Sequence, residues 1–206
     1  MYNVEVLNGW MDPSMNKFLI ALITLGTIVS PANANNTEKI SGDLYTQHQT
    51  LWNAIKSVGV KTYLNPPGCE VLKTKDVAGM YFPNKGKLII CQDNYDHKKG
   101  RVRVNWTAND LDTLRHEAHH LVQDCAIGKF GDGYTSKLFK DEALANFIKK
   151  SGMNFSEVNA IVEEYIGMKY EPEHIMMELE AYAAARAVTP NLIAQKVIEF
   201  CSPKSP

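Results

Sequence analysis

Residues 116–120 read His-Glu-Ala-His-His, and they contain the pattern H-E-x-x-H with the spacing of a metal site. On a helix, positions i and i+4 lie one above the other on the same face, so His116 and His120 can offer two imidazole nitrogens to one ion. Glu117 lies beside that pair, within reach of a water molecule on the metal. Two ligands and a general base are parts of a zinc hydrolase site. We therefore expect Zn²⁺ at the two histidines, with Glu117 as the base.

The helix that must position this pattern is well marked. Thr107 is followed three residues later by Asp110, which predicts a capping box, and the helix is expected over residues 109–125. The histidine pair lies on a polar face together with Gln123 and Asp124. The opposite stripe consists of apolar residues at three- and four-residue spacing, namely Leu111, Leu114, Ala118, Leu121, Val122 and Cys125.

A third ligand is needed, because catalytic zinc takes three protein ligands and leaves one position for water. Residues 178–186 are rich in Ala, Leu and Glu and predict a second helix, which carries Glu178 and Glu180. These glutamates are two positions apart and project about 160° from each other, so only one can face the metal. Periodicity does not decide between them. His174 is a weaker candidate, and His119 projects about 100° away from the histidine pair.

An H-E-x-x-H helix followed by a later helix with E-x-x-A resembles the gluzincins, zinc peptidases in which a glutamate on the second helix completes the site. By that resemblance Glu178 is the third ligand, and Ala181 lies three residues later. Small alanines let the second helix approach the first closely. Thermolysin-like members usually carry Asp or Asn where this chain has Tyr182. The resemblance covers the two helices and the segment between them. It implies a zincin-like fold with an edge strand that binds extended substrate.

The expected function is hydrolysis of peptide bonds in a peptide or protein substrate by metal-activated water. Glu117 takes the proton from that water and passes it to the leaving amine. Asp124 is a candidate partner for a ligand histidine, or a cap for the helix end. Candidates for stabilising the oxyanion are Tyr134, Tyr170 and Tyr182. The alternative is a non-catalytic exported protein, either a metal-binding domain or a disulfide-stapled binding domain.

The rest of the chain predicts an α+β fold. Residues 43–58 carry apolar side chains at helical intervals, and residues 77–91 read as a β-hairpin with its turn at 83–86. Residues 128–134 contain three glycines and predict a loop near the site. Further helices are expected over 137–150, 154–166, 172–188 and 190–200. The predicted architecture is a small antiparallel sheet, whose hairpin precedes the metal helix, followed by a mostly helical C-terminal part.

The N-terminus has the form of a secretory signal peptide. Lys17 precedes an apolar run over residues 18–29, and an A-x-A site ends at Ala34. The run is too short for a comfortable membrane span, so we expect no stable membrane insertion after cleavage. An uncleaved N-terminal anchor is the alternative. We expect residues 1–14 to be an upstream misread extension, 15–34 to be the signal peptide, and 35–206 to be a single metallopeptidase domain that is secreted or periplasmic.

Charge excludes nucleic acid as a partner. The chain holds 22 basic and 23 acidic side chains, and removal of residues 1–34 leaves the two kinds equal in number. Without a basic excess there is no electrostatic footprint for nucleic acid or anionic lipid. Composition does not determine the oligomeric state.

Four cysteines follow the predicted cleavage site, and an even number in an exported protein predicts disulfides. Sequence alone leaves three pairings open. Cys69 with Cys91 would staple the β region, and Cys125 with Cys201 would tie the tail to the end of the metal helix. None has the C-x-x-C spacing of a zinc knuckle or a redox pair.

Overall fold

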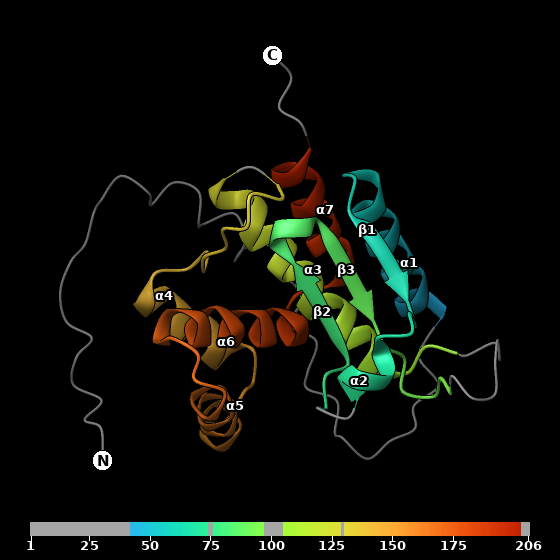
Figure 1. The fold of residues 1–206 in the computed structure, drawn as a ribbon. Helices are drawn as coiled ribbons and strands as arrows, with labels where there is room; N and C mark the ends of the chain where they lie inside the picture. The colour runs from blue at the N-terminus through green and yellow to red at the C-terminus, as the bar shows by residue number, and fades with distance from the viewer. Residues whose placement is uncertain (1–41, 74–75, 97–104, 129, 203–206) are drawn as a thin grey trace.

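The computed structural model describes residues 42–73, 76–96, 105–128 and 130–202 (Figure 1). The predicted extension and signal peptide, residues 1–34, lie outside the described residues. The described part is α+β and mostly helical, with seven α-helices and one three-stranded sheet. In this part of the chain, no helix has both the length and the apolar character needed to cross a membrane.

The N-terminal part contains the predicted helix and hairpin. The helix is α1 (Gly42–Ser57), and the hairpin pairs β2 (Gly79–Phe82) with β3 (Lys87–Ile90) in antiparallel fashion. The turn between them is a short 3-10 helix, η3 (Pro83–Lys85), followed by Gly86 at φ 51°. Glycine adopts this left-handed conformation without a steric penalty, so Gly86 allows the chain to turn back into β3.

The sheet is mixed, so the prediction of an antiparallel sheet was wrong. A third strand, β1 (Lys61–Leu64), pairs in parallel with β3, and the strand order is β1-β3-β2. Neither β1 nor the short helix α2 (Cys69–Lys73) was predicted from the sequence. β1 has four residues, none of them buried, and α2 has five, so neither is long enough to show a periodic apolar pattern. The order leaves β2 at an edge of the sheet.

The C-terminal helices confirm the predicted order, with bounds that differ by a few residues. The helix that carries the H-E-x-x-H pattern begins with the predicted capping box between Thr107 and Asp110, and its apolar stripe is buried throughout. The helices are α3 (Ala108–Ile127), α4 (Asp141–Lys150), α5 (Phe155–Gly167), α6 (Pro172–Ala187) and α7 (Pro190–Cys201).

α3 is covered on more sides than its sequence pattern predicts. It packs against β2, β3, α1, α6 and α7, and Figure 1 shows it behind the sheet. Gln123 and Asp124, which were expected on a polar face, are completely buried. Buried polar side chains need hydrogen-bond partners. The polar side chains on this face of α3 must therefore find partners on the elements that cover it.

Two disulfides select one of the three possible pairings. Cys69 pairs with Cys91 beside the sheet, and Cys125 pairs with Cys201, which ties α7 to α3. All four cysteines are paired. Two disulfides are typical of proteins that fold in an oxidising, extracellular compartment.

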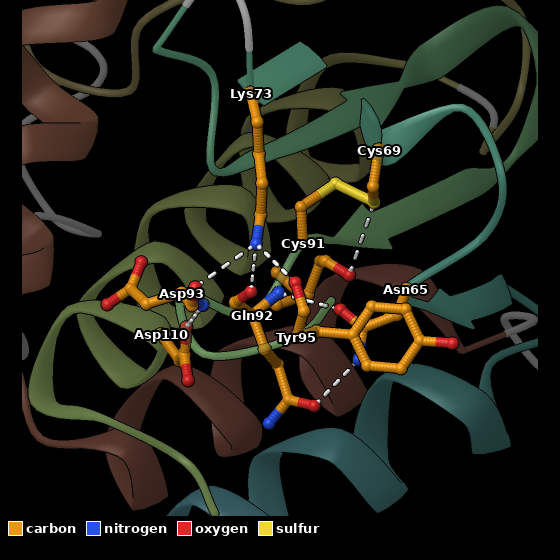
Figure 2. The surroundings of a disulfide bond; sticks show 9 residues. Asn65, Cys69, Lys73, Cys91, Gln92, Asp93, Tyr95 and Asp110 are labelled. Carbon is orange, nitrogen blue, oxygen red and sulfur yellow. Dashed lines mark hydrogen bonds between the residues drawn. A yellow bond between two sulfur atoms is a disulfide. The ribbon is translucent and has the colours of Figure 1, made fainter. Parts of the chain in front are cut away.

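The segment after β3 is hydrogen-bonded to α2 and to α3 (Figure 2). Lys73 Nζ, at the end of α2, donates to the backbone carbonyls of Gln92, Asp93 and Tyr95. The backbone N–H of Asp93 donates to Asp110 Oδ1 in the first turn of α3 at 2.9 Å. The sheet therefore holds the start of the helix that carries the H-E-x-x-H pattern.

We expect loss of the Cys125–Cys201 bridge to destabilise the fold more than loss of Cys69–Cys91. The bridged residues are 76 and 22 positions apart. Cross-linking constrains the unfolded chain more when the loop is longer, by about 4.5 kcal/mol and about 3.4 kcal/mol for these two loops. Chemical denaturation of the two double Cys→Ser variants would measure both losses. Equal losses would contradict this order, and a free thiol in the unreduced wild type would contradict the pairing.

Candidate metal centre

α3 and α6 bring three of the predicted ligands together. Glu178 Oε2, on α6, lies 3.2 Å from His116 Nε2 and 3.3 Å from His120 Nε2 on α3. The two histidine nitrogens are 3.0 Å apart. The side chains are only 10–13% exposed, so the group is mostly buried but still reached by solvent. These three residues form a group that could hold a metal ion.

The spacing of the three atoms fits a shared cation better than a set of hydrogen bonds. Around a four-coordinate zinc ion with bonds of about 2.0–2.1 Å, the ligand atoms lie about 3.3 Å apart. If both histidine nitrogens donated to Glu178 Oε2, two N–H groups whose nitrogens are only 3.0 Å apart would converge on one oxygen. If one accepted from the other, its lone pair would face the carboxylate. A cation at the centre satisfies all three atoms at once.

Electrostatics within the group also favour a cation. Burial raises the pKa of Glu178, but the attraction of His120 and His116 outweighs it and holds the pKa well below its usual range. Burial lowers the pKa of His120, but Glu178 outweighs this effect and raises the pKa to about 9. The carboxylate therefore stabilises a positive charge at His120 Nε2, and a metal ion would take the place of that proton.

Glu117 is buried directly beside this group. Burial raises the pKa of its carboxyl, and the two histidines oppose that shift. The first residue of β2, Gly79, packs against it: a Cβ at that position would lie 3.1 Å from Glu117 Cγ and 2.5 Å from Thr113 Cγ2. A larger residue at this position would force the Thr113 side chain or the strand to shift. The absence of a side chain therefore lets the edge strand lie against the predicted base.

Glu180, the alternative ligand, binds other partners. It is completely buried, and its carboxylate accepts hydrogen bonds from His119 Nε2 at 2.8 Å and from Gln123 Nε2 at 3.2 Å. The backbone N–H groups of Leu138 and Phe139 also donate to it. Four donors on two segments, α3 and the chain that precedes α4, therefore bind one carboxylate on α6, and Glu180 connects the three segments.

Gln123, and not the candidate Asp124, is the side chain that hydrogen-bonds to His120, one of the predicted ligands. Gln123 Oε1 lies 2.8 Å from His120 Nδ1. Asp124 instead accepts hydrogen bonds from the hydroxyl of Tyr81 and the backbone N–H of Gly131, and so joins α3 to β2 and to the loop that follows α3. In the sequence both residues read as surface positions, because nothing local shows that other elements cover this face of α3.

Two tyrosines lie at the site. The ring of Tyr182, one of the three predicted candidates, packs edge-on against that of His116 with the centroids 4.6 Å apart. Tyr165 on α5, which the sequence analysis did not consider, donates its hydroxyl hydrogen bond to Glu178 Oε2 at 2.9 Å. Tyr165 comes from a neighbouring helix, and a single sequence carries no signal for such a contact.

The other candidates lie on the surface. Tyr134 is 72% exposed, in the loop after α3. Tyr170 packs edge-on against Tyr165 and against His174, which is itself exposed. His174 is not part of the group that could hold a metal ion among the described residues.

Residues 42–201 match the family model described as "Domain of unknown function (DUF8637)". No curated protein and no solved structure matches the chain. The matched region runs from the first residue of α1 to the last residue of α7, so the candidate metal centre lies wholly within the family's domain.

Proposed function

The chain belongs to the DUF8637 family, and we propose from the geometry of its site that it is an exported zinc-dependent peptidase. The observation that carries the proposal is the convergence of His116, His120 and Glu178 on one point beside the buried Glu117. Two imidazoles and one carboxylate, with a fourth position left for water, are the ligand set of catalytic rather than structural zinc. A histidine-bearing helix packed against a later helix that supplies a glutamate is also what the gluzincin resemblance implies, and a zincin-like fold is part of the proposal.

The reaction is hydrolysis of a peptide bond. Zinc bound here supplies a water molecule whose pKa is lowered to about 7, and it polarises the scissile carbonyl. Glu117 takes the proton from that water and delivers it to the leaving amine. The hydroxyl of Tyr182 is the candidate for stabilising the oxyanion, because its ring packs on His116. The single hydroxyl proton of Tyr165 is already donated to Glu178.

The edge strand supports an extended peptide as the substrate. β2 is at the edge of the sheet, and Gly79 brings it against Glu117. Extended peptides bind exposed sheet edges by backbone pairing. A peptide paired with β2 would therefore run past the predicted base. The two disulfides support a place of action outside the cytoplasm.

We expect about one zinc ion per chain to remain after dialysis, because three protein ligands hold it. Elemental analysis would measure the metal, and hydrolysis of an unfolded protein substrate would be assayed on the same sample. A chelator should remove zinc and activity together, and added zinc should restore both. A wild-type protein that retains no transition metal would contradict the proposed function.

A further inference from the structure

Gln123 is buried between α3 and α6, and its side-chain amide contacts acceptors on one side only. Its Nε2 lies 3.2 Å from the backbone carbonyl of Met177 and 3.2 Å from Glu180 Oε1. A carbonyl oxygen and a carboxylate oxygen both accept hydrogen bonds, so the NH₂ group of the amide must face them. The amide oxygen therefore faces His120 Nδ1, at 2.8 Å.

The opposite orientation of this amide is excluded by the same contacts. A flipped Gln123 would set its oxygen against the Met177 carbonyl and against a carboxylate. Glu180 is already an acceptor for His119 and for two backbone N–H groups, so it has no proton to offer. An unpaired buried hydrogen-bonding group costs about 1–3 kcal/mol. The flip would remove the Gln123 donor from the Met177 carbonyl and from Glu180 and would place an oxygen against both.

We propose that Gln123 is a positioning residue for the metal, acting through His120. The amide oxygen can bind His120 only when Nδ1 carries a proton. In the neutral ring this leaves Nε2 as a lone pair, and Nε2 is the atom that faces His116 and Glu178. The proposal rests on the proposed function, because it takes His120 as a metal ligand.

His116 provides the contrast within the same site. Its Nδ1 is buried and has no hydrogen-bond partner in the described part of the chain. His120 is therefore the ligand whose ring is oriented by a hydrogen bond, and His116 is held by packing against Tyr182. Removal of a partner of this kind typically costs 10–100-fold in metal affinity.

The test compares zinc affinity in the wild type, Gln123→Met and Gln92→Met by competition with a chelator. Both glutamines are buried, and methionine keeps the side-chain length while removing the hydrogen bonds. Gln92 is the matched control, because its amide oxygen accepts from Asn65 at the far end of β1. We expect a roughly 10- to 100-fold loss for Gln123→Met and less than about threefold for Gln92→Met. Thermal unfolding would show that both variants fold.

A second measurement needs no variant. In zinc-loaded wild-type protein with ¹⁵N-labelled histidine, the Nδ1–H of His120 should exchange with solvent more slowly than that of His116, because only the former has an acceptor. Equal exchange of the two protons would overturn the proposal. Unchanged zinc affinity in Gln123→Met, or an equal loss in Gln92→Met, would overturn it as well.

The outcomes for this inference and for the proposed function are distinguishable. Wild-type protein that binds zinc and shows the protected proton, yet cleaves no peptide, overturns the peptidase function alone. Wild-type protein that binds zinc and cleaves peptide, with an affinity insensitive to Gln123→Met, overturns the inference alone. Wild-type protein that does not bind zinc overturns both.

Discussion

We expect Glu117→Gln to retain zinc and to lose nearly all peptide hydrolysis. The amide has the shape of the carboxylate but cannot take a proton from water at neutral pH. The three proposed ligand side chains, His116, His120 and Glu178, are unchanged. Loss of a general base costs about 10²–10⁴-fold, so we expect kcat/KM to fall by on the order of a thousandfold. Steady-state kinetics and elemental analysis of the same preparation measure the two properties separately.

Stability provides the control for this variant. Burial raises the pKa of Glu117, which means that the site disfavours its charged form. A neutral amide should therefore fit with little change in the free energy of unfolding. If Glu117→Gln hydrolysed peptides as fast as the wild type, the base would have to be another residue. If it lost its zinc, Glu117 would be needed to hold the ligands.

Glu178→Ala and Glu180→Ala should fail in different ways. Glu178→Ala removes a proposed ligand. Loss of a residue that only hydrogen-bonds to a ligand costs up to about 100-fold in metal affinity, so we expect a larger loss of zinc affinity here. Glu180→Ala leaves its buried donors, including His119, without their acceptor. Each buried donor left without its acceptor costs about 1–3 kcal/mol, so this variant should lose several kcal/mol of stability. Its zinc affinity should change far less.

Chelator competition and chemical denaturation of both variants test this separation. The zinc measurement is made at a temperature at which Glu180→Ala remains folded, so that unfolding does not count as loss of metal. The Met177 carbonyl still orients the Gln123 amide in that variant, which is why most of the affinity should remain. The opposite ranking of zinc affinities would assign the third ligand to Glu180. Equal affinities would mean that neither glutamate binds the metal.

The local patterns of the sequence predicted most of the elements. The capping box at Thr107, the apolar stripe of α3, the hairpin that becomes β2 and β3, and the order of the C-terminal helices are all in the structure. Each is carried by residues close together in the chain, where backbone geometry converts spacing directly into direction. β1 was not predicted because its own residues show no strand pattern. It forms by pairing with β3, which follows α2 and β2 in the chain.

The two glutamates of α6 show where local information ends. Their two-residue spacing already required them to point in different directions. Which of them meets the histidines depends on which face of α6 packs against α3, a contact between residues about sixty positions apart. The same packing buries Gln123 against His120 and brings Tyr165 to Glu178. The sequence by itself predicted the two histidines and Glu117 as the base, and it left Glu178 and Glu180 as the main candidates for the third ligand. Tertiary packing placed Glu178 at the histidines, because a helix defines the directions of its side chains but not the partners that it will meet.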